Sequence, residues 1–129
     1  MPIMVKGIEH TAIASPDPGR LAQWYVDHLN FVVNYRSGSS KTLFVKAANG
    51  SMIEIIEARN QPSAPDMRDA GLRHLAIEVT DVAAEYARLR QRGVAFFAEP
   101  QTSGGNTIAF FADCDGNLLH LLHREKPLP

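Results

Sequence analysis

The chain has very little cysteine and no long hydrophobic run. Its only cysteine is Cys114, so no disulfide can form within the chain, which is typical of a reducing compartment. No apolar segment reaches the roughly 20 residues that a membrane-spanning helix needs. Residues 1–7 also lack the hydrophobic core of a signal peptide. We therefore expect a cytoplasmic protein without a membrane partner, in which Cys114 is a small residue at a strand end.

The chain also lacks a surplus of charge of either sign. Its 13 basic and 14 acidic residues give a net charge of −1, so there is no excess of positive charge to bind nucleic acid. Hydrophobic residues make up 45% and charged residues 21% of the 129 positions, which is ordinary for a globular protein. The length suits one compact domain over residues 1–129.

What the sequence does contain is an internal repeat. Residues 7–13 resemble residues 71–77, with Gly7, His10 and Asp17 each matched 64 positions later. Farther along, Glu54 is matched by His120 at a spacing of 66 residues. An insertion of two residues in the second half explains why the two spacings differ. The chain therefore consists of two related halves, and two copies are typical of a duplication and not of a solenoid array.

Both halves predict the same order of elements. Each starts with a strand, continues with a helix that an aspartate caps, and ends with three strands. In the first half these are a strand at 5–14, a helix at 18–29 and strands at 31–37, 42–48 and 51–58. In the second half they are a strand at 73–80, a helix from 82 to about 92 and strands at 94–98, 107–113 and 118–123.

These elements predict an α+β fold of two β-α-β-β-β modules, which form a cupped mixed β-sheet with the helices outside. Module one covers about residues 5–60 and module two about residues 71–125. The linker between them covers about residues 61–70, where prolines interrupt the pattern.

Four residues that commonly bind metals occupy equivalent places in the two halves: His10, Glu54, His74 and His120. Side chains alternate across a strand, and both faces of the strands that carry Glu54 and His120 are mainly apolar. A polar group in such surroundings needs a partner. Any one of the four alone is more simply a core or surface residue, but their joint placement predicts one divalent metal ion. Imidazole and carboxylate ligands suit zinc, iron, nickel, manganese or cobalt.

The same residues resemble the vicinal oxygen chelate superfamily, which includes glyoxalases, bleomycin resistance proteins and extradiol dioxygenases. The resemblance covers nearly the whole chain, and residues 7–13, 24–31, 52–56, 71–77 and 113–120 carry it. In that superfamily a metal ligand lies in the first and last strand of each module. The resemblance therefore implies metal binding by His10, Glu54, His74 and His120, and it implies a homodimer.

One position departs from the superfamily pattern. The last ligand is usually a glutamate that also carries a proton in glyoxalase-like enzymes, whereas here it is His120. This puts glyoxalase I activity itself in doubt and leaves Glu54 as the expected catalytic base. Glu78, four residues after His74, could share the face of its strand but is more simply a surface residue.

The expected function is that of a metal-dependent lyase or isomerase, in which the metal holds two neighbouring oxygens of a small substrate and stabilises an enolate. The expected wall of the substrate site includes Phe44, Met52 and Phe110. Two alternatives stay open: an iron-dependent ring-cleaving dioxygenase and a non-catalytic protein that binds a small molecule or confers resistance.

Overall fold

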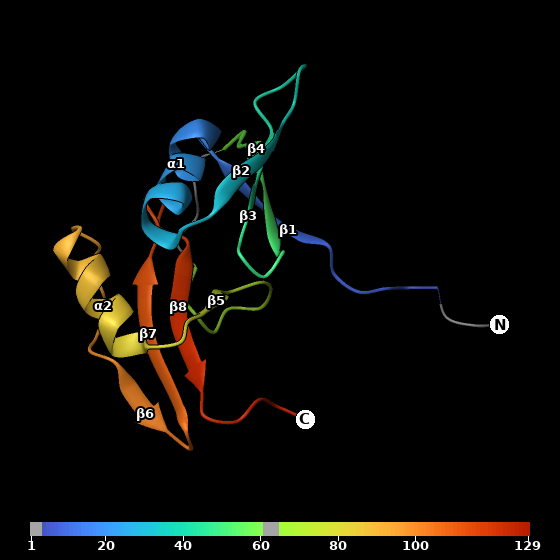
Figure 1. Cartoon of the computed structure of the whole chain (residues 1–129). Helices are drawn as coiled ribbons and strands as arrows, with labels where there is room; N and C mark the ends of the chain where they lie inside the picture. The colour runs from blue at the N-terminus through green and yellow to red at the C-terminus, as the bar shows by residue number, and fades with distance from the viewer. Residues whose placement is uncertain (1–3, 61–64) are drawn as a thin grey trace. The chain divides into compact units, whose positions relative to one another are not determined.

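One pattern of elements occurs twice along the chain, as Figure 1 shows for the computed structural model, which describes residues 4–60 and 65–129. The first set comprises β1 (His10–Ser15), α1 (Pro18–Leu29), β2 (Val32–Arg36), β3 (Leu43–Lys46) and β4 (Met52–Glu57). The second set comprises β5 (Leu75–Glu78), α2 (Val82–Gln91), β6 (Gln101–Ser103), β7 (Asn106–Ala112) and β8 (Leu118–Arg124). The predicted α+β fold of two β-α-β-β-β modules is confirmed.

The two sets belong to two compact units, residues 1–62 and 63–129, which we call unit one and unit two. Unit one contains a four-stranded sheet in the order β1-β4-β3-β2, and unit two contains one in the order β5-β8-β7-β6. In each sheet the first strand of the unit runs parallel to its last strand, while the other neighbours are antiparallel. Both sheets are therefore mixed, as predicted. The start of the predicted linker, residues 61–64, lies outside the described part of the chain.

Each helix begins immediately after an aspartate, Asp17 or Asp81, which the internal repeat places at equivalent positions. The Asp17 carboxylate accepts a hydrogen bond from the Arg20 amide at 3.1 Å, and the Asp81 carboxylate accepts one from the Ala84 amide at 3.0 Å. These bonds satisfy amides that have no partner inside the helix. Helix α1 ends at Asn30, which takes the left-handed conformation with φ of 58°. Among the described residues, no helix is both long enough and apolar enough to cross a membrane.

Each helix packs on one face of its own sheet. In unit one, Leu21 and Tyr25 of α1 are fully buried together with Val45 and Ile55 of the strands below. In unit two, Leu89 of α2 is fully buried. Alternation along the strands then turns every second side chain to the face away from the helix, which we call the distal face of each sheet. The predicted site residues in the strands lie on these distal faces.

Two predicted strands differ from the observed ones. The strand predicted at 5–14 starts only at His10, because its partner β4 starts at Met52, which pairs with His10. The strand predicted at 94–98 is wrong: only Phe96 forms a bridge there, to Phe111, and β6 lies at Gln101–Ser103. Pro100 separates the two stretches and has no amide hydrogen to donate to β7.

Candidate metal and substrate site

Unit one brings two of the predicted ligands together. His10 is the first residue of β1, and Glu54 lies in the parallel neighbour β4, opposite Ala12. The Nε2 atom of His10 is 3.7 Å from Oε1 of Glu54. The side chains of His10 and Glu54 are 34% and 28% exposed, so both remain accessible to a ligand. The two residues occupy the first and last strands of one module, which is where the sequence places two of the four expected ligands.

The other ring nitrogen of His10 is held by a residue that the sequence reasoning did not single out. Nδ1 of His10 lies 2.8 Å from Oε1 of Glu9. A carboxylate only accepts, so Nδ1 is the protonated nitrogen that donates this bond, and in the neutral ring the lone pair is then on Nε2. Metal-binding histidines commonly show this arrangement, with the second nitrogen donating to a carboxylate or a carbonyl. Adjacency to His10 was the only signal for Glu9 in the sequence.

Unit two brings the other two predicted ligands together. His74 lies immediately before β5, and His120 lies in the middle of β8, opposite Ala76. Their ring centroids are 4.7 Å apart. His120 is only 8% exposed, and its Nδ1 donates to the carbonyl of Leu121 at 3.1 Å. In the neutral ring, Nε2 of His120 therefore carries a free lone pair, as in His10.

Burial keeps the His120 ring neutral. Loss of solvent lowers the pKa of His120, the hydrogen bond to the Leu121 carbonyl raises it, and the electrostatic effects of the neighbouring His74 and Arg124 lower it further. The charged form of a buried imidazole is disfavoured because it loses its hydration. The neutral form is the one that can donate a lone pair to a metal ion.

The predicted ligands thus form two pairs, one in each unit. Across residues 4–60 and 65–129, no group of three or more histidine, cysteine, aspartate or glutamate side chains is placed to hold a metal ion. Each pair alone offers two ligands, fewer than the three or four protein ligands typical of zinc. The convergence of the four residues on one metal ion therefore stays a prediction.

The predicted wall residues lie beside the pairs. The ring of Phe44 stands edge-on to the His10 ring at 5.1 Å. Phe110 lies 4.9 Å from the His120 ring and 5.9 Å from the His74 ring. Met52 is half-buried on the distal face of unit one. In each unit, a phenylalanine therefore supplies an apolar side to the pair of ligand-type residues.

Three further residues, Glu78, Trp24 and Cys114, lie outside the two pairs. The burial pattern of β5 alternates, and Glu78 is exposed at its end, in phase with His74. Trp24 is half-buried, with its ring 5.1 Å from the His28 ring. Cys114 is half-buried in the turn between β7 and β8.

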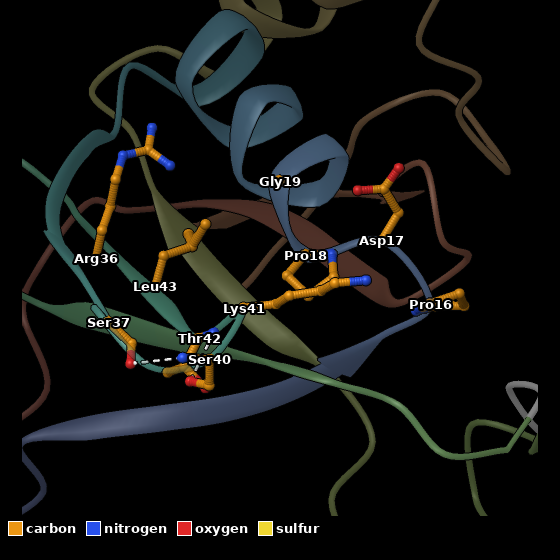
Figure 2. A pocket seen from close by; sticks show the side chains of 10 residues that line it. All are labelled: Pro16, Asp17, Pro18, Gly19, Arg36, Ser37, Ser40, Lys41, Thr42 and Leu43. Carbon is orange, nitrogen blue, oxygen red and sulfur yellow. Dashed lines mark hydrogen bonds between the residues drawn. The ribbon is translucent and has the colours of Figure 1, made fainter.

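A separate groove of about 470 Å³ lies in unit one between the start of α1 and the β2–β3 connection (Figure 2). None of the seven predicted site residues lines it. Lys41 at its rim pairs with Glu57 at 2.9 Å, and this bond raises the pKa of Lys41. The Ser37 hydroxyl accepts hydrogen bonds from the amides of Ser39 and Ser40. These groups already have partners, and the groove is distinct from the predicted site because no site residue lines it.

The sequence matches a known protein family over most of its length. The model of the Glyoxalase/Bleomycin resistance protein/Dioxygenase superfamily matches residues 7–121. The chain belongs to this superfamily. The match contains all four expected ligands, His10, Glu54, His74 and His120, and it ends at residue 121, within β8.

Individual proteins are also similar to this chain over most of its length. Uncharacterized protein YaeR of Escherichia coli (strain K12) is 32% identical over 91% of this chain and 95% of its own length. The crystal structure of the glyoxalase family protein from Enterococcus faecalis is 28% identical and has a TM-score of 0.76, covering 94% of this chain and 100% of that one. TnmS3, an antibiotic binding protein from Streptomyces sp. CB03234, shares the fold at 24% identity, with a TM-score of 0.74 over 93% of this chain and 97% of that one.

Proposed function

We propose that this protein is a metal-dependent lyase or isomerase that acts on a small substrate with two neighbouring oxygens. The observation that carries the proposal is the same in both units. His10 and His120 each use Nδ1 to donate to a fixed acceptor, which leaves Nε2 for a metal ion. Members of the superfamily generally bind a metal.

The proposed ligands are His10, Glu54, His74 and His120. Three imidazoles and a carboxylate suit zinc, iron, nickel, manganese or cobalt, and the absence of cysteine from the set argues against a structural zinc site. When bound, the divalent ion supplies a Lewis acid that draws electrons from the two substrate oxygens. The partly exposed side chains of His10 and Glu54 leave room for a substrate beside the ion.

Glu54 is the proposed base. Its carboxylate removes the proton from a substrate carbon that bears a hydroxyl beside a carbonyl and returns it to the carbonyl carbon, while the hydroxyl proton passes to the former carbonyl oxygen, which gives an isomerisation. His120 replaces the glutamate usual at the last position, and its buried neutral ring suits binding better than proton transfer. Phe44 and Phe110 exclude water from one side of each pair.

Metal analysis tests the proposal. Protein purified without added metal should contain about one divalent ion per chain. His74→Ala should lose this metal and keep its fold by circular dichroism, because His74 precedes β5 and is exposed. His123→Ala is the matched control, since it removes a histidine from β8 outside the pair and should leave the metal in place. Full metal content in His74→Ala would contradict the proposed ligand set.

The same measurement separates the alternatives. If the wild-type protein holds no metal even after zinc, iron, nickel, manganese and cobalt are each supplied, the enzyme proposal is wrong and non-catalytic binding of a small molecule takes its place. Iron alone in the purified protein would favour ring-cleaving dioxygenase chemistry. We further propose that the protein works in the cytoplasm, for which the single cysteine is the support.

A further inference from the structure

A row of side chains crosses the distal face of the unit-one sheet. The register places Ala12 and Phe44 on either side of Glu54, and Tyr35 next to Phe44. The order of the row is therefore a small residue, a ligand-type residue, a phenylalanine and a second aromatic residue. We call Phe44 and Tyr35 the aromatic shelf.

Unit two contains a row of the same order. Ala76 and Phe110 lie on either side of His120. The bridge between Phe96 and Phe111 places Phe97 opposite Phe110, and the Phe97 amide donates to the Phe110 carbonyl at 3.0 Å. Phe97 lies 62 residues after Tyr35, a spacing that differs from those of the sequence repeat, which is why only the strand pairing reveals the equivalence.

A β-bulge in β2 brings Tyr35 to this face. The pairing with β3 shifts between Val33 and Tyr35, so Asn34 is an extra residue. Such a bulge turns two consecutive side chains to one face, and the side-chain Nδ2 of Asn34 indeed donates to the sulfur of Met52 at 3.3 Å. Tyr35 stands edge-on to Phe44 at 5.9 Å and is nevertheless 55% exposed.

We propose that the aromatic shelf binds a flat aromatic part of the substrate, so that the substrate class is an aromatic compound with two neighbouring oxygens. This inference rests on the proposed function and names its substrate class. Strands in a sheet lie about 4.8 Å apart, so the row extends roughly 10 Å from Glu54 to Tyr35. A short aliphatic oxygen chelator at Glu54 ends beside Phe44, whereas a phenyl group extends onto the exposed ring of Tyr35. Aromatic groups gain from edge-to-face and stacked contacts with such rings.

Two hydroxamates test the shelf, because they present the same pair of neighbouring oxygens and differ only in a phenyl or a methyl group. Binding of benzohydroxamate and acetohydroxamate is measured by calorimetry on protein loaded with one equivalent of zinc. Wild-type protein should prefer benzohydroxamate by about tenfold or more. Tyr35→Ala should lower the affinity for benzohydroxamate roughly fivefold and leave the affinity for acetohydroxamate unchanged. Tyr35→Phe keeps the ring and should retain the preference.

Val32→Ala is the matched control. It shortens an exposed apolar side chain of β2 that pairs with Lys46, outside the row, and should change neither affinity. Two results would disprove the role of the aromatic shelf without affecting the proposed metal site. One is equal affinity of zinc-loaded wild-type protein for the two hydroxamates, and the other is an equal loss of affinity for both in Tyr35→Ala. The zinc content of the same samples separates this result from failure of the proposed function: a protein that retains no zinc refutes the metal site and the substrate class derived from it.

Discussion

Three of the four proposed ligands are imidazoles, and their protonation decides what they can bind. A histidine binds a metal ion only through an unprotonated nitrogen. His10 and His120 fix the proton of the neutral ring on Nδ1 through different acceptors, the Glu9 carboxylate and the Leu121 carbonyl. The lone pair of each neutral ring is therefore on Nε2, although the two histidines have different exposure.

The lowered pKa of His120 predicts how stability depends on pH in the metal-free protein. The unfolded chain takes up a proton at this residue near pH 6.5, whereas the folded protein takes it up only at a lower pH. The unfolded state therefore binds more protons as the pH falls, and the contribution of neutral His120 to stability is complete above pH 6.5 and is lost below it.

Urea unfolding at several pH values between 7.5 and 5 measures this effect. The midpoint for the wild-type protein should fall as the pH decreases through this range. His120→Gln removes the titrating group, so its midpoint should change less over the same range. The same pH dependence in both proteins would show that His120 does not contribute to it.

At the scale of elements, each helix depends on a single aspartate at its start. Asp17→Ala and Asp81→Ala should each lower the free energy of unfolding by about 1 kcal/mol, because each leaves an amide in the first turn without its acceptor. Chemical unfolding measures the loss. Asp17→Asn and Asp81→Asn keep a side-chain oxygen and should stay within a few tenths of a kcal/mol of the wild type. If the asparagine variants lose as much free energy of unfolding as the alanine variants, the charge of the aspartate and not its hydrogen bond stabilises the helix start.

The strands were harder to predict than the helices. A helix has caps and an apolar period in its own sequence, and α1 begins and ends where these signals predict. A strand depends on its partner. The apolar residues at 94–98 suggested a strand, but pairing with β7 is interrupted before Pro100 and resumes at Gln101. The bulge at Asn34 likewise has no signal in β2 alone.

At the scale of the whole molecule, we expect a homodimer. Members of the superfamily often form dimers, and closed two-fold assemblies are the commonest oligomers. The segments before β1 and β5 also expose large apolar side chains at equivalent positions: Ile8 is 92% and Leu72 is 87% exposed. We expect a dimer interface to cover these two side chains, because their burial removes apolar surface from water.

Light scattering at micromolar concentration tests the dimer and should give twice the chain mass of 14.2 kDa. Ile8→Glu places a charge in the expected interface and should shift the mass toward that of one chain. A monomer mass for the wild-type protein would rule out a stable dimer at that concentration.

The sequence by itself determined the repeat, the two capped helices and the four ligand-type residues at equivalent positions, because these signals lie within short segments or recur at a fixed spacing. Tertiary structure decided the rest. Strand pairing brought His10 to Glu54, gave β6 its place and aligned Tyr35 with Phe44 as Phe97 aligns with Phe110. These features depend on hydrogen bonds between residues distant in the chain, and a shift of one residue in register would turn every side chain of a strand to the other face.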